Sequence, residues 1–121
     1  MSVRFKVFGS GRLAGEGQRV DQFYPLFDPV PPGKSYVVNA MRFVNTTYSP
    51  VTFSIALHRE VPDAGISTII IFPDNGVWPL GARQCAIEDA ELTLGPNEVI
   101  CGRVGVQNVI DFVISGIERD A

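Results

Sequence analysis

Apolar and polar residues alternate along much of the chain with the period of two that is typical of a half-buried β-strand. Val3, Phe5 and Val7 alternate with two cations, and four apolar residues alternate with polar ones over residues 51–58. Residues 35–45 are rich in Val, Tyr, Met and Phe and contain no breaker. These patterns predict strands over residues 3–8, 35–45 and 51–58, and the turn at residues 45–50 predicts that the last two pair as a hairpin.

The remaining apolar segments are short. Residues 23–27 are aromatic but include Pro25, which favours an edge strand. Residues 66–72 are apolar on both faces, as expected for a strand that is covered on both sides, with another subunit as one possible cover. Further strands are expected over the following ranges: 83–87, 89–94, 99–104 and 109–117. No stretch of ten residues has helical spacing.

Short strands separated by Gly, Pro and Asn turns predict an all-β fold, a single-domain antiparallel β-sandwich that is jelly-roll-like with about eight strands. The 121 residues suit one core, so the domain spans residues 1–121. Residues 9–22 include four glycines and are expected to form a loop or an extended arm.

Composition adds an expectation of assembly. The chain is 45% hydrophobic and 19% charged, which is typical of a folded domain. Its mean hydropathy of +0.16 is high for a small monomer and predicts apolar surface buried against a partner. Eight of the ten cations are Arg, the cation enriched at protein interfaces.

Charge and hydropathy also limit the partners. A net charge of −3 gives no electrostatic reason to expect nucleic acid. The longest apolar run, residues 69–73, is far shorter than the roughly 20 residues that cross a bilayer, so no membrane partner is expected. The first residues lack the features of a signal peptide, which predicts synthesis in a cytoplasm.

No set of residues in the sequence predicts catalysis or a cofactor. His58, the single histidine, is expected at the surface on the polar face of its strand, and one histidine cannot build a metal cupin site. Cys85 and Cys101 are outside any CxxC pair and are expected to be small buried hydrophobes rather than a disulfide or a nucleophile. We therefore predict a protein that is not an enzyme and has no cofactor or metal.

Charged and aromatic residues supply the candidate recognition sites. The densest acidic group, Glu88, Asp89 and Glu91, is expected to be exposed charge at a strand bend, or to pair with Arg12 or Arg19 of a neighbouring subunit. Trp78 is expected to cap the core or anchor an interface, and the alternative is a sugar-binding role beside Asp74 and Asn75. The candidate interface and recognition residues are Arg12, Arg19, Phe23, Tyr24 and Trp78.

Several segments resemble a known family. Residues 23–27 (Phe-Tyr-Pro-Leu-Phe), 32–38 (Pro-Gly-Lys-Ser-Tyr-Val-Val) and 40–47 (Ala-Met-Arg-Phe-Val-Asn-Thr-Thr) resemble small bacteriophage virion proteins of β-sandwich type. In that family an aromatic strand, a turn, a Val-rich strand and an Asn-Thr turn follow one another. Residues 92–100 and 113–118 resemble the later leucine, turn and closing steps, with Asn97 where the family has Asp.

The resemblance implies a structural role in a phage particle. The expected protein is a capsid decoration or cement protein of the virion, made in the host cytoplasm, which oligomerises, with a homotrimer favoured, and stabilises the shell beside other phage capsid or tail proteins. The alternative is a tail-associated or receptor module that binds carbohydrate.

Overall fold

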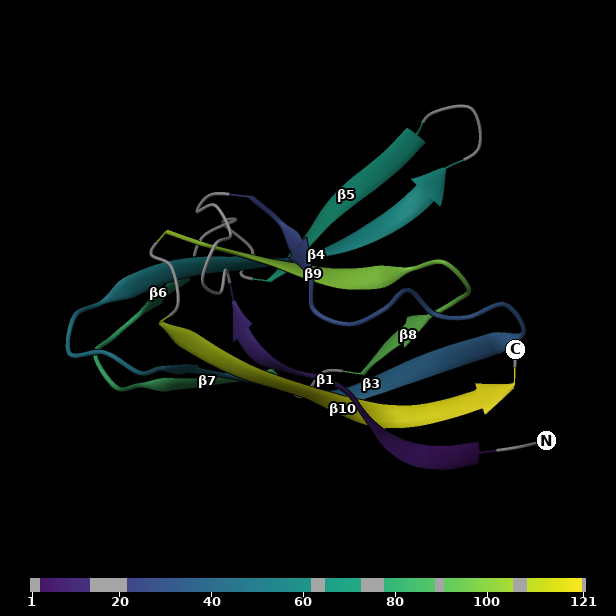
Figure 1. The fold of residues 1–121 in the computed structure, drawn as a ribbon, viewed down its shortest axis with the longest axis horizontal. Coiled ribbons are helices and arrows are strands. Elements are labelled where there is room, and N and C mark those ends of the chain that lie inside the picture. The colour runs from purple at the N-terminus through teal and green to yellow at the C-terminus, as the bar shows by residue number, and fades with distance from the viewer. Residues whose placement is uncertain are drawn as a thin grey trace.

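The structure is a computed structural model that describes residues 3–13, 22–61, 65–72, 78–88, 91–105 and 109–120. These residues form ten strands in two layers (Figure 1). The strands are β1 (Val3–Leu13), β2 (Tyr24–Pro25), β3 (Lys34–Asn45), β4 (Val51–Val61), β5 (Gly65–Phe72), β6 (Trp78–Leu80), β7 (Cys85–Glu88), β8 (Leu92–Leu94), β9 (Val99–Val104) and β10 (Ile110–Asp120). In this part of the chain, no helix is long and apolar enough to cross a membrane.

The two layers are antiparallel sheets. Sheet A has the order β1-β10-β3, with β7 and β8 both pairing with the other side of β3. Sheet B has the order β2-β9-β4-β5, and the short β6 also pairs with β4. Counting β7 and β8 as one interrupted edge, each sheet has four principal strands. Because successive strands pass back and forth between the layers, the predicted jelly-roll-like sandwich of about eight strands is confirmed.

The predicted hairpin between β3 and β4 is wrong, because β3 lies in sheet A and β4 in sheet B. Asn45, the last residue of β3, is fully buried where the chain crosses between the sheets. Its Nδ2 donates to the carbonyl oxygens of Ser49, Leu80 and Gly81 at 2.8, 3.2 and 3.1 Å. Its Oδ1 accepts from the backbone N–H of Thr47 at 2.9 Å. A satisfied buried amide thus fixes the corner.

The core lies between the two sheets and is built from alternate residues of their strands. Phe43 of β3 and Phe53 of β4 meet across the layers with ring centroids 5.1 Å apart. The other large apolar side chains that are fully buried are Leu13, Val30, Val38, Ile55, Leu94, Ile100, Val104, Ile110 and Ile114. Their removal from water is the main source of stability of the sandwich.

The first strand is longer than the sequence predicts. Of the expected loop or arm at residues 9–22, residues 9–13 continue β1 and pair with β10, so for them the prediction is wrong. Residues 14–21 lie outside the described residues. Gly9 permits this continuation, because a Cβ there would collide with the carbonyl oxygen of Leu26. The glycines therefore allow close packing of a strand rather than a free loop.

The edges of sheet B match the sequence in part. β2, which contains Pro25, is an edge strand as predicted. The strand predicted over residues 66–72 is β5, at the opposite edge, and β4 is its one neighbour among the described strands. β9 pairs with β4 only as far as His58, whereas β4 and β5 continue beyond it. The end of this hairpin rises away from both layers (Figure 1). The cover by another subunit stays a prediction.

Candidate interaction surface

Sheet A carries apolar side chains on the side that faces away from the core. We call this the sheet A outer face and define it by Phe5, Val7, Ile87, Val113 and Ile117. Phe5 is 84% exposed, Val7 58% and Ile87 56%, while Val113 and Ile117 of β10 are half-buried. Phe5 lies directly opposite Ile117, so neighbouring strands bring these side chains together. Contiguous exposed apolar side chains of this kind mark interaction sites.

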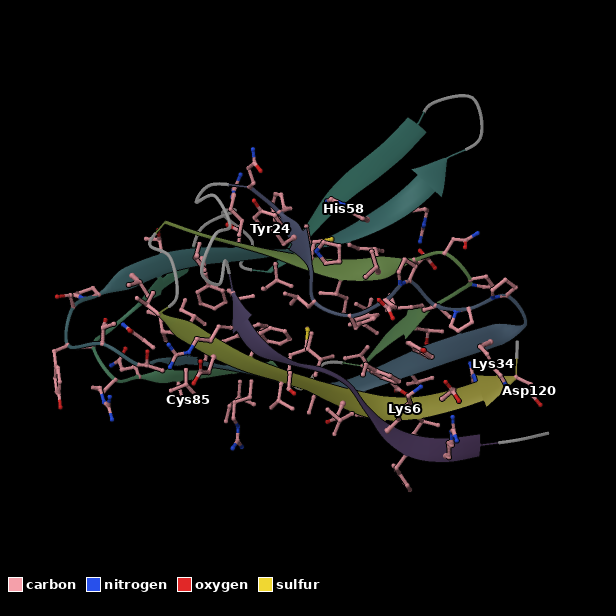
Figure 2. The ribbon with its side chains drawn as sticks, viewed as in Figure 1. Lys6, Tyr24, Lys34, His58, Cys85 and Asp120 are labelled. Carbon is pink, nitrogen blue, oxygen red and sulfur yellow. The ribbon has the colours of Figure 1, made fainter. Side chains whose placement is uncertain are left out.

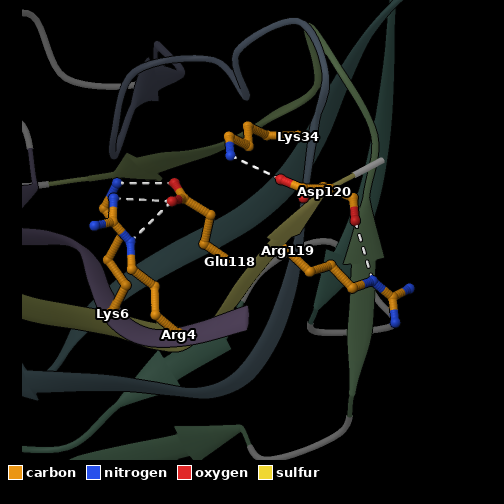
Figure 3. A network of polar contacts seen from close by, with 7 residues as sticks. Arg4, Lys6, Lys34, Glu118, Arg119 and Asp120 are labelled. Carbon is orange, nitrogen blue, oxygen red and sulfur yellow. Dashed lines mark hydrogen bonds and ion pairs between the residues drawn. The ribbon is translucent and has the colours of Figure 1, made fainter. Parts of the chain in front are cut away.

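The exposure of Phe5 follows from where its two neighbours point. Arg4 and Lys6 both reach Glu118 of β10, with nitrogen to oxygen distances of 2.9 and 3.1 Å (Figure 3). Because side chains alternate along a strand, this places Phe5 on the opposite side of the sheet. The alternation of β1 was correctly predicted, but the cations take the inner side and the aromatic residue takes the outer one.

Glu118 is a buried carboxylate at the end of the sandwich. Its side chain is 8% exposed, and both its oxygens accept hydrogen bonds from cations. The hydrogen bonds from Lys6 and then Arg4 hold the pKa of Glu118 below its usual range. The ammonium of Lys6 also lies 5.7 Å from the centre of the Tyr36 ring. This cluster ties the first strand to the last and fixes which face of β1 is exposed.

Two β-bulges hollow the sheet A outer face. The pairing of β1 with β10 shifts between Val7 and Gly9, and that of β10 with β3 shifts between Ser115 and Gly116. A hollow of about 370 Å³ lies beside them, lined by Phe5, Lys6, Val7, Asn39, Ser115 and Gly116. A bulge bends and twists a strand locally, so the irregular register accounts for this hollow beside Phe5 and Val7.

Arginines lie within and beside the same face. Arg42 is exposed on β3, between Val113 and Ile87 in the pairing register. Arg12 of β1 pairs with Asp111 of β10 at 2.7 Å, and the Arg119 Nε donates to Ser35 Oγ at 3.2 Å (Figure 3). Exposed apolar side chains interspersed with arginines have the composition of a protein interface.

The corresponding side of sheet B is covered. Ser54 and Ala56 of β4 and Cys101 of β9 alternate with core residues and therefore point away from the core, yet all three are buried. Phe23, which precedes β2, packs over this side of the sheet. The Arg103 guanidinium carbon lies 4.6 Å from the centre of the Phe23 ring, and the Arg103 Nη2 donates to Ser54 Oγ at 3.4 Å. Sheet B thus has packed side chains on both faces.

His58 belongs to this covered side. Its ring meets that of Phe23 edge to face at 5.7 Å, and it is half-buried rather than a surface side chain, so the sequence prediction is wrong. Its Nε2 is buried and has no hydrogen-bond partner among the described residues. The alternation of β4 does place His58 on the outer side, but Phe23 covers that side.

The candidate recognition residues do not form one site. Arg12 is on sheet A and pairs with Asp111 of its own chain, whereas Phe23 lies on the covered side of sheet B. Tyr24 lies in β2, at the edge of sheet B (Figure 2). The Tyr24 hydroxyl donates to Gln22 Oε1 at 3.2 Å. Arg19 lies outside the described residues. The backbone of Trp78 pairs with Phe53 in β6, and its side chain lies outside the described part of the chain.

The two cysteines differ. Cys101 is fully buried, as predicted, and burial raises the pKa of its thiol to about 11. Cys85 is exposed, so the prediction of a buried residue is wrong for it. It stands at the start of β7, an edge strand, opposite Val44, and no further strand of the described chain covers it. Both thiols are free, and they lie on different sheets.

The acidic group is described only in part. Glu91 is exposed, in agreement with the sequence prediction, whereas Asp89 and the side chain of Glu88 lie outside the described residues. Among the residues that the structure describes, no three His, Cys, Asp or Glu side chains gather where they could hold a metal ion.

Sequence reasoning did not select Phe5, Val7 or Ile87 as functional residues. The alternation around Phe5 was visible, but it gives two faces and does not say which one meets the other sheet. The missing information was the position of Glu118, which is 114 residues from Arg4 in sequence. In comparisons with known proteins, no family model matches this chain, and no curated protein or solved structure matches it.

Proposed function

We propose that this protein is a non-enzymatic structural component of a phage particle, a capsid decoration or cement protein that docks on the other subunits of the shell through the sheet A outer face. The observation that carries the proposal is the exposure of Phe5 and Val7, which line a hollow on a face that also carries arginines. A single jelly roll that leaves such a face open has a surface ready for burial against a partner.

The residue composition of the sheet A outer face suits a permanent interface rather than a transient one. Its centre is apolar, and Arg12 is paired within the chain, which leaves apolar burial as the main source of binding free energy. The phage assignment rests on the family resemblance of residues 23–118. We choose the shell-binding role over the sugar-binding module because its surface lies among the described residues, whereas the sugar hypothesis depends on the side chain of Trp78, which does not.

The test is rebinding of the purified chain to particles of the phage that encodes it, stripped of this protein. Phe5→Ser is expected to raise the dissociation constant for rebinding at least about tenfold, since an exposed anchor contributes on the order of 1.4 kcal/mol or more when it is buried. Bound protein is measured by co-sedimentation, and mass spectrometry first establishes that the chain is part of the particle.

Tyr48→Ser is the matched control. Tyr48 is as exposed as Phe5, at 84%, but it lies in the connection between β3 and β4 with Arg83 over its ring. It should leave rebinding unchanged. Absence of the chain from purified particles, or equal rebinding of Phe5→Ser and wild type, would show that the proposal is wrong.

A further inference from the structure

The edge strand β5 differs from the other edges of the sandwich in what protects it. β1 carries Arg4, Lys6 and Arg12 and contains a bulge. β2 has two residues, one of them Pro25, and β7 and β8 have four and three residues. Charges, proline, bulges and short length are the devices by which proteins prevent an edge strand from pairing with another chain. These edges are therefore closed to strand addition.

β5 has little of this protection. It runs for eight residues, Gly-Ile-Ser-Thr-Ile-Ile-Ile-Phe, with no charge and no proline, and it is rich in β-branched residues. Its single register irregularity lies at its end, opposite Ile55 and Ala56. Among the described strands β4 alone pairs with it, so the backbone N–H and C=O groups on its other side lack a strand partner in this part of the chain.

The hairpin also projects from the molecule. β9 starts at Val99, opposite His58, so among the described strands the backbone segments 59–61 and 65–67 pair with each other alone. Figure 1 shows them rising away from both layers. Arg59 holds the base of the hairpin by pairing with Glu98 at 2.7 Å. A two-stranded ribbon is marginally stable by itself in water, so an added strand would stabilise it.

We propose that β5 is a homodimer contact, at which β5 of a second copy of this chain adds antiparallel to its free edge about a two-fold axis. A two-fold contact needs a surface that complements itself, and an uncharged edge has no like charges to oppose. The inference goes beyond the proposed function, because this contact is separate from the sheet A outer face and is tested without any particle.

The first experiment measures the mass of the purified chain by sedimentation over a concentration series. Wild type is expected to dimerise, and Ile69→Lys to raise the dissociation constant by about tenfold or more, because it puts equal charges at the pairing edge. Ser67→Lys provides a second variant should Ile69→Lys fail to fold, which circular dichroism establishes. Phe5→Ser, the variant that tests shell docking, should dimerise as wild type does.

The second experiment locates the axis. Single cysteines are placed in turn at residues 66–70 in a Cys85→Ser background, since Cys101 is buried. Opposed residues of antiparallel strands have Cα atoms about 4.5–5.5 Å apart, which suits a disulfide, so oxidation should link the chains most at one position and less on either side.

Hydrogen exchange gives an independent measurement on the unmodified chain. Protection of the segment 65–72 should increase with protein concentration, because dimerisation gives its edge amides a partner. A wild type that stays monomeric, a trimer that Ile69→Lys leaves intact, or uniform cross-linking along β5 would each overturn the proposal.

Discussion

The strands of both sheets alternate core-facing and outward-facing residues, but the outward-facing apolar side chains are buried on sheet B and exposed on sheet A. On sheet B, Ala56 and Cys101 point away from the core and are still buried, and Phe23 packs against Arg103 and His58 on the same side. On sheet A, Phe5 and Val7 also point away from the core and are exposed. An apolar side chain that points away from the core is therefore buried where other side chains pack over it, and is a candidate interface residue where none do.

The largest expected effect is on stability when the same charge is placed on each side. Ala56→Lys should lower the free energy of unfolding by at least about 3 kcal/mol, because it buries an ammonium on the covered side of sheet B. Val7→Lys should change it by no more than about 0.5 kcal/mol, because Val7 is largely exposed. Urea unfolding of both variants checks this, and similar costs on the two sides would show that the comparison is wrong.

An intermediate effect is expected on the pH dependence of stability, through the cluster of Glu118, Arg4 and Lys6 that places Phe5 on the outer side. The pKa of Glu118 is lowered in the folded chain by hydrogen bonds from Lys6 and Arg4. A lowered folded pKa gives stability that is present above the unfolded value of about 4.3 and is lost as the pH falls through the folded value. Urea unfolding from about pH 7 down to about pH 3 should show this loss, and Glu118→Gln should reduce it.

Glu91, an exposed carboxylate near β8, supplies the control for this pH series. Glu91→Gln should preserve the loss of stability in acid that Glu118→Gln reduces. An unchanged acid profile in Glu118→Gln would mean that the pairing with Arg4 and Lys6 contributes nothing to folding, and that another interaction sets the face of β1.

The smallest expected effect is a difference in thiol reactivity between the outer sides of the two sheets, which is measured without changing the stability of the fold. Cys85 is exposed on sheet A, whereas Cys101 is buried with a thiol pKa of about 11. Because the thiolate is the reactive form, a thiol reagent at neutral pH should modify one thiol per folded chain and two after unfolding. Cys85→Ser should abolish the fast reaction, and equal rates for both thiols would contradict the cover over sheet B.

Local pattern was enough for much of the fold. The alternation of residues 51–58 and the unbroken run of residues 35–45 gave β4 and β3, and the strand predicted over residues 99–104 is β9. The pairing of β3 with β4 as a hairpin was wrong, because the same Asn-Thr turn residues serve a corner between sheets. Which of the two occurs depends on the buried amide of Asn45 meeting Leu80 and Gly81, far along the chain.

The residues of the candidate surface could be predicted from the sequence less well than the strands. Phe23 was selected and lies in the cover of sheet B rather than at an open surface. Arg12 was selected and pairs with Asp111 of the same chain. The sequence pattern predicts only that Phe5 belongs to a half-buried strand, whereas its exposure in the structure is the main evidence for the proposed interface. Each difference arises from a contact between residues distant in sequence, which composition and periodicity do not encode.

Local pattern alone predicts an all-β sandwich for this protein, because a period of two and frequent turn residues are local properties that persist in any strand arrangement. Which side of each strand is covered depends instead on contacts between residues far apart in the sequence. Alternation creates two faces, and the side that meets water depends on what packs there. On sheet B, Phe23 packs against His58 and Arg103, whereas on sheet A the pairing of Arg4 and Lys6 with Glu118 leaves Phe5 exposed.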